Sequence, residues 1–119
     1  MHIGGQRYTV EVAATTATRE RGLSGHERLA ADAGMWFVFP EAGMPGFWMR
    51  GMRFPIDLIW VSPERKVLGV ATLSICRDAP CPITYPPAPT IQVLEIDAGR
   101  FRGRVGDKVE WRCSIARVR

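Results

Sequence analysis

Residues 34–61 read GMWFVFPEAGMPGFWMRGMRFPIDLIWV, a stretch that largely decides the fold. It holds three of the four Trp, four of the five Phe and four of the five Met residues of the chain. So much rigid apolar surface either builds the core of a small domain or lines a binding groove beside that core. Which of the two it does is the main functional question that the sequence raises.

The same stretch predicts β structure. Residues 36–39, 47–50 and 55–61 are rich in aromatic and β-branched side chains and are separated by Gly and Pro, so each is predicted to be a strand. Because side chains alternate along a strand, Phe37 and Trp36 are expected on opposite faces.

The segments on either side continue this pattern. Further strands are predicted at residues 8–12, 67–73, 91–96 and 108–115, whereas residues 79–89 contain five Pro and are expected to form an extended loop. Seven to eight short strands with turns at this spacing are typical of a compact barrel or a jelly-roll-like sandwich. We therefore predict an all-β fold with a short helical insertion after the first strand.

The helical insertion has two predicted parts. Thr16 or Thr18 is expected to cap a helix that ends at Arg21. Residues 24–31 are predicted to add a second helical turn, because they open with the Ser-x-x-Glu pattern of a capping box.

The bulk composition indicates one globular domain over residues 1–119, expected to be a monomer. Its 46% apolar and 24% charged residues are ordinary for a folded protein. No apolar run reaches the roughly 18 residues of a membrane-spanning helix, so no membrane span is predicted. The N-terminal residues lack the basic and apolar segments of a signal peptide. We expect an exported or periplasmic protein if a leader was removed, and a cytoplasmic one otherwise.

The chain has three cysteines. Cys76 and Cys81 are close enough in sequence to form a disulfide that staples a loop in an exported protein, whereas in the cytosol they would stay two loop thiols. Cys113 is expected to be a small buried residue of the last strand. Neither a CxxC motif nor a His/Cys cluster with zinc-site spacing is present, so no metal and no cofactor are predicted.

Two acidic residues lie in apolar strands, Asp57 in PIDLIWV and Glu95 in IQVLEID. A desolvated carboxylate takes up a proton or finds a cation, and Arg50 and Arg21 are the candidate cations for Asp57. One interpretation is that each acid binds an Arg or a set of loop N–H groups, which fixes a turn. The other is an acid/base pair for glycoside hydrolysis, whose two carboxyl groups lie about 5–10 Å apart.

The run FWMR, residues 47–50, alternates between a core face and a face that carries Trp48 and Arg50. A Trp beside an Arg at a sheet surface can stack on sugars, aromatic groups or peptide. It can equally be covered by the Pro-rich loop as part of the core. If the face is open, the groove lies between FWMR and that loop. The predicted ligand-binding residues are Trp48, Arg50, Asp57, Tyr85 and Arg21.

Basic residues gather at the C-terminal end of the chain, whose net charge is +4. Residues 98–119 hold seven basic and two acidic residues. Such an end can attract phosphate or another anionic surface, but Arg scattered along strand edges also protects those edges and keeps the protein soluble. Nucleic acid is therefore the weakest of the predicted partners.

Several short motifs, in order along the chain, resemble those of one family. They are Arg21-Gly22-Leu23, Gly34-Met35 with Phe37-Val38-Phe39, Phe47-Trp48-Met49-Arg50, Pro55-Ile56-Asp57, Leu94-Glu95 with Ala98-Gly99, and Gly106-Asp107. The family is the bacterial and archaeal domain-of-unknown-function family numbered 192. The resemblance covers about residues 16–110, and FWMR followed by PID is its most specific part.

The resemblance implies a compact β-barrel or jelly-roll-like sandwich and no established activity. Many relatives look exported or lipid-anchored, which favours a disulfide between Cys76 and Cys81. The chain departs from the family pattern at two places: Ser24 stands where relatives usually have Met, and Gly51-Met52 replaces an Asn-Thr pair. A ligand contact made by that polar pair would be lost here.

Three functional hypotheses follow. The first is a non-catalytic binding module for a sugar, peptide or protein partner, in which Asp57 orients Arg50. The second is a small hydrolase that uses Asp57 and Glu95. The third is a binder of nucleic acid or another anionic surface through the basic C-terminal strands.

Overall fold

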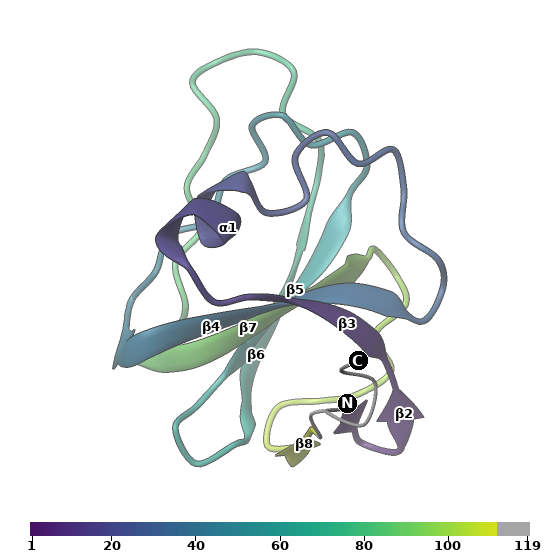
Figure 1. Ribbon diagram of the computed structural model, residues 1–119, viewed down its shortest axis with the longest axis vertical. Helices are drawn as coiled ribbons and strands as arrows, with labels where there is room; N and C mark the ends of the chain where they lie inside the picture. Colours follow the sequence, from purple (N-terminus) through teal and green to yellow (C-terminus); the bar gives the residue numbers. More distant parts are fainter. Residues whose placement is uncertain (112–119) are drawn as a thin grey trace, which may run out of the picture.

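The computed structural model describes residues 1–111, in which the chain forms eight strands and one short helix (Figure 1). Five strands form a large sheet in the order β3-β4-β7-β5-β6, and three form a small sheet in the order β2-β1-β8. In chain order the elements are β1 (His2–Ile3), β2 (Gln6–Arg7), β3 (Thr9–Ala13), α1 (Thr16–Arg21), β4 (Ala33–Gly43), β5 (Ile56–Val61), β6 (Val67–Leu73), β7 (Thr90–Asp97) and β8 (Val109–Glu110).

Strand β7 occupies the middle of the large sheet because it pairs with both β4 and β5. All pairs in this sheet are antiparallel except β3 and β4, which are parallel. A parallel pair needs a crossover connection, and α1 with residues 22–32 supplies it. Figure 1 shows α1 on one side of the large sheet and the three short strands on the other.

The large sheet separates two hydrophobic clusters. Phe37 and Leu58 belong to the cluster under α1 and the long loops. Trp36 and Ile59 belong to the cluster between the two sheets. This division follows the alternation of side chains along each strand, as predicted from the sequence.

The predicted all-β class is confirmed in the form of a compact sandwich. Strands β3 and β6 are the two outer strands of the large sheet and do not pair with each other, so that sheet does not close. The barrel alternative is therefore wrong. The two faces of the large sheet are covered by separate hydrophobic clusters, which is the arrangement of a layered sandwich.

Helix α1 confirms the helical insertion with two corrections. Its N-cap is Thr15, not Thr16 or Thr18, because the Thr15 hydroxyl accepts a hydrogen bond from the Thr18 N–H at 3.1 Å. The predicted second helical turn is wrong, since residues 24–31 form turns and coil. Gly25 has a φ of +83°, which breaks right-handed helical geometry.

Strand lengths around the aromatic stretch also differ from prediction. Strand β4 continues through Pro40, because its register with β7 shifts between Val38 and Gly43 and the proline, which lacks an N–H, falls outside the regular ladder. Residues 47–50 are not a strand. Only Phe47 pairs, in a single bridge to Thr84.

At the C-terminal end, β8 spans two residues of the predicted strand at 108–115. Residues 112–119 lie outside the described part of the chain, and so does the prediction for Cys113. No helix among residues 1–111 has the length and hydropathy needed to cross a membrane.

Candidate functional site

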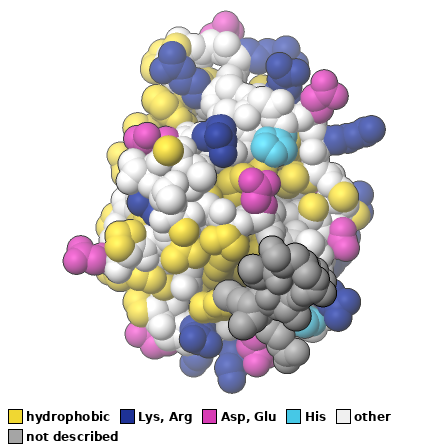
Figure 2. All heavy atoms as spheres, viewed as in Figure 1, with side chains coloured by type: hydrophobic (Ala, Val, Ile, Leu, Met, Phe, Trp, Pro, Cys, Tyr) yellow, Lys and Arg dark blue, Asp and Glu magenta, His cyan; other side chains and the backbone are white. Residues whose placement is uncertain are grey.

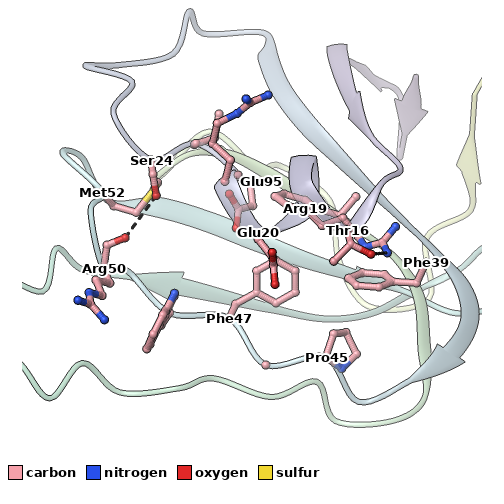
Figure 3. A pocket seen from close by; sticks show the side chains of 16 residues that line it. Thr16, Arg19, Glu20, Ser24, Phe39, Pro45, Phe47, Arg50, Met52 and Glu95 are labelled. Carbon is pink, nitrogen blue, oxygen red and sulfur yellow. Dashed lines mark hydrogen bonds between the residues drawn. The ribbon is translucent and has the colours of Figure 1, made fainter.

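The main hollow of the described chain lies between α1 with its following turn and residues 45–52, above β4 and β7. Its volume is about 480 Å³. We call it the Glu95 pocket. In Figure 3, Arg50 and Met52 stand at one end of the pocket, Thr16 and Phe39 at the other, and Glu95 lies between them.

Glu95 forms the polar part of the pocket floor. It lies on β7 opposite Met35 on β4 and Leu58 on β5, so its side chain emerges from the face that carries the α1 cluster. Only 5% of the residue is exposed, and within residues 1–111 its carboxyl group has no hydrogen-bond or ion-pair partner. Burial raises the pKa of Glu95 to about 8, so the group is mainly protonated at neutral pH.

Three phenylalanine rings form an apolar wall. The Phe37 and Phe47 rings meet edge to face with centroids 5.2 Å apart, and the Phe39 and Phe47 rings do so at 6.4 Å. Such pairs fix ring orientation beyond simple burial. The pocket therefore keeps a defined apolar shape next to the Glu95 carboxyl.

Three arginines line the pocket, and they differ in how they are held. Arg19 donates hydrogen bonds to the backbone carbonyls of Ala14 and Val38 and stacks on Phe39, so its guanidinium has a structural role. Arg50 lies 5.5 Å from the ring centroid of Trp48. Neither Arg50 nor Arg21 places its guanidinium in a hydrogen bond or ion pair with another described residue.

Trp48 is not a core residue. It is 51% exposed and lines the pocket, while its neighbour Met49 is buried in the α1 cluster. The predicted division of FWMR into a core face and an outer face therefore holds, although the segment is not a strand. Of the predicted binding residues, Trp48, Arg50 and Arg21 lie together at this pocket.

Asp57 lies elsewhere, and the prediction that it orients Arg50 is wrong. Its side chain emerges on the opposite face of the sheet, opposite Ile96 on β7. One carboxylate oxygen accepts from the Thr72 hydroxyl at 2.7 Å, and the other accepts from the N–H groups of Gly99 and Phe101 at 3.0 and 3.3 Å. Asp57 thus fixes the turn after β7, as the structural interpretation anticipated.

The same geometry separates Asp57 from Glu95. Asp57 faces Ile96 and Leu58 faces Glu95, so the two acids occupy opposite faces of one sheet. The pair postulated for glycoside hydrolysis is not formed, because both groups would have to flank a single bond.

Tyr85 and the Pro-rich loop do not form the second wall of the pocket. The N–H groups of Phe47 and Thr84 donate to each other's carbonyl oxygens at 2.9 and 2.8 Å, which ties the loop to FWMR where the groove was predicted. Tyr85 remains 57% exposed beyond this pairing. The groove lies on the other side of FWMR, against α1.

Cys76 and Cys81 are joined by a disulfide at the start of the Pro-rich loop. A second hollow of about 430 Å³ lies beside it, lined in part by Met49 and Thr84. This second hollow lies next to the pairing of Phe47 with Thr84. Neither Asp57 nor Glu95, the two predicted catalytic residues, lines it. In residues 1–111 no three His, Cys, Asp or Glu side chains are grouped to hold a metal ion.

The two departures from the family pattern meet at the Glu95 pocket. Ser24 and Met52 both line it, and a Cβ on Gly51 would lie 3.2 Å from the Ser24 Oγ. The Ser24 hydroxyl donates to the Arg50 carbonyl at 3.4 Å. The two positions at which the chain was expected to depart from the family pattern therefore lie at the candidate site.

Of helix α1, sequence reasoning found only Arg21. Thr16, Arg19 and Glu20 line the pocket, and only the polar surface of a short helix signalled them. Sequence reasoning treated Glu95 either as a catalytic partner of Asp57 or as an acid bound to an Arg or to loop N–H groups, and the described residues supply neither arrangement. The available signal was a Glu on the face of β7 that carries Val93, a buried residue of the α1 cluster.

Two arginines of the basic C-terminal end contact neighbouring groups of the chain. Arg100 is 3.9 Å from the Asp97 carboxylate, and Arg102 donates to the Gly99 carbonyl. Figure 2 shows that basic side chains on that view are scattered among acidic and hydrophobic ones. Arg112, Arg117 and Arg119 lie outside the described residues.

Comparison with known proteins places the chain in a family. Residues 1–111 match the model of the DUF192 family, described as "Uncharacterized ACR". None of the curated proteins matches the sequence. A protein of unknown function from Novosphingobium aromaticivorans DSM 12444 is 34% identical with a TM-score of 0.81, and the match covers 87% of this chain and 75% of that one.

A second crystal structure has a similar fold. It is a protein of Sinorhizobium meliloti 1021 called a candidate transcription regulator, 27% identical with a TM-score of 0.79. That match covers 87% of this chain and 81% of the other. With its family match over residues 1–111, its sandwich fold and the motifs around FWMR and PID, the chain belongs to the DUF192 family.

Proposed function

We propose that the protein is a non-catalytic binding module whose ligand occupies the Glu95 pocket. The observation that carries the proposal is the unpartnered Glu95 carboxyl at the floor of an open, aromatic hollow. The carboxyl faces the hollow with no hydrogen-bond partner among the described residues, so a ligand in the pocket can hydrogen-bond to it without displacing an existing protein contact. Pockets of this kind, mostly apolar with a few convergent polar groups, are typical ligand sites.

Binding fits the lining better than hydrolysis does. The predicted catalytic pair is split between two faces of the sheet. The Ser24 hydroxyl is directed at a backbone carbonyl, and neither His nor Cys lines the pocket. The aromatic wall supplies apolar contact, while the Glu95 carboxyl and two guanidinium groups without hydrogen-bond partners among the described residues supply hydrogen bonds to a ligand.

Trp48→Ala is expected to remove most binding without unfolding the domain. Half of the indole is exposed, so its removal should lower the unfolding free energy by about 1 kcal/mol or less. The ligand, in contrast, loses a stacking surface worth about 1 kcal/mol or more, which is at least a fivefold loss of affinity. The measurement is NMR titration with a library of fragments, monosaccharides and short peptides, together with thermal unfolding.

Tyr85→Ala is the matched control, because Tyr85 is an equally exposed aromatic residue outside the pocket. It should leave affinity unchanged. Equal affinities for the wild type and Trp48→Ala would contradict the proposal, as would a library in which no compound shifts the resonances of the pocket.

A further inference from the structure

The pocket wall formed by residues 46–48 is an unpaired backbone edge. Phe47 directs both its N–H and its C=O toward Thr84. In an antiparallel ladder the residues on either side of such a pair turn their peptide groups the other way. Gly46 and Trp48 flank Phe47, both line the Glu95 pocket, and their backbone groups have no hydrogen-bond partner in the described chain.

Gly46 shows that this wall is backbone and not side chain. A Cβ at Gly46 would meet Ile83 at 2.6 Å and Tyr85 at 2.9 Å, both on the Pro-rich loop. A side chain at position 46 would therefore point toward the Pro-rich loop. The part of Gly46 that faces the pocket is its main chain. The chain presents donors and acceptors there without a side chain in front of them.

We propose, building on the function proposed above, that the ligand is an extended polypeptide segment that pairs as a strand with the backbone of Gly46 and Trp48. One of its apolar side chains would enter the Glu95 pocket, and an acidic side chain would meet Arg50 and Arg21. Strand addition of this kind takes affinity from main-chain hydrogen bonds and specificity from pockets for alternate side chains.

Spacing and charge favour a peptide over a sugar. The free groups of Gly46 and Trp48 recur every two residues, about 7 Å apart, which is the repeat of another strand. The hollow of about 480 Å³ holds one or two side chains beside the aromatic wall. The guanidinium groups of Arg50 and Arg21 are exposed and make no hydrogen bond or ion pair with a described residue, and the lining holds three arginines against two acidic residues, Glu20 and the buried Glu95. The rim therefore favours an acidic segment.

The test uses the full chain and a library of N-acetylated, C-amidated hexapeptides. The tightest binder is resynthesised with a single N-methyl group at each position in turn, and affinity is measured by calorimetry. An N-methyl group removes one donor and blocks pairing, so one register of alternating positions should lose at least tenfold and the intervening positions little. Arg50→Gln should weaken an acidic peptide about fivefold and reduce the salt dependence of binding.

Two results would overturn the inference alone. One is an affinity that N-methylation leaves unchanged at every position, and the other is a pocket that binds monosaccharides or fragments while no peptide binds. In both cases the Glu95 pocket remains a binding site of another class. If neither peptides nor the other compounds perturb the pocket, the proposed function falls together with the inference.

Discussion

Glu95→Gln should remove a large pH dependence from the stability of the protein. Relative to the variant, the unfolding free energy of the wild type should fall by roughly 4 kcal/mol between about pH 4.5 and pH 8. The cause is the burial of the Glu95 carboxyl, which raises its pKa from 4.5 to about 8 in the folded chain. Below pH 4.5 the two proteins should be similarly stable, since Gln resembles a protonated Glu in shape.

The sign follows from the protons bound by each state. Between pH 4.5 and pH 8 the folded protein holds a proton on Glu95 that the unfolded chain has released. Stability must therefore decrease as the pH rises through this interval, and it stops depending on this group only well above pH 8, once Glu95 has also lost its proton in the folded protein. The same pocket is lined by three arginines and by Glu20. Interactions in this pocket are therefore the first to change when Glu95 ionises.

Urea unfolding at half-unit pH steps measures this effect, with Glu20→Gln as the matched control. Glu20 lines the same pocket but is exposed, so Glu20→Gln changes a carboxyl of the pocket and should retain the fall in stability that the buried Glu95 causes. Parallel profiles for the wild type and Glu95→Gln would show that Glu95 is ionised in the folded protein. Glu95 would then not be an unpaired, protonated acid in the pocket.

Asp57→Ala should be among the most destabilising single changes in the chain, at about 4 kcal/mol. Asp57 is 4% exposed and its carboxylate accepts hydrogen bonds from the N–H groups of Gly99 and Phe101. Ala leaves both donors without that acceptor in the turn after β7, at a cost of about 1–3 kcal/mol each. Binding at the Glu95 pocket should survive in the folded fraction, because Asp57 lies on the other face of the sheet.

Thr72→Val is the control for this prediction. It removes only the hydroxyl that donates to Asp57 and should cost about 1 kcal/mol. Chemical unfolding measures both variants. A loss in Asp57→Ala no larger than that in Thr72→Val would mean that the turn is held by other contacts.

Tyr8 offers a second readout in the conservative variant Asp57→Asn. Burial raises the pKa of Tyr8 to about 12, and the negative charge of Asp57 adds to this shift. Removal of that charge should lower the pKa of Tyr8, which ultraviolet titration detects, while burial keeps it above the ordinary value of 10. An unchanged titration would place the Asp57 charge too far from the ring to matter.

Sequence patterns were most reliable within the buried strands. The alternation along residues 36–39 correctly placed Trp36 and Phe37 on opposite faces of the sheet, because a shift of one residue would expose the buried side chains. The same alternation in FWMR separated Phe47 and Met49 from Trp48 and Arg50, although that segment is not a regular strand.

Patterns failed where a choice depended on what lies across a gap. The local sequence does not distinguish a loop that pairs with FWMR from one that faces it across a groove. In the structure the Pro-rich loop pairs with FWMR through Phe47 and Thr84. Likewise, two acidic residues in neighbouring apolar strands can lie on the same face of the sheet or on opposite faces, depending on how the two strands are aligned. The register of β5 with β7 places Asp57 and Glu95 on opposite faces.

The sequence alone determined the all-β class, the family and the alternation of side chains along the buried strands, whereas the open position of Trp48 came only from the structure. The class and the alternation follow from side-chain periodicity and apolar burial, which act over a few neighbouring residues. The tertiary structure alone decided that α1 forms the opposite wall, that Glu95 lies unpaired at its floor and that the peptide groups of Gly46 and Trp48 flank it. Those features arise from contacts between segments far apart in the chain, whose spacing is set by packing and strand register and not by local preference.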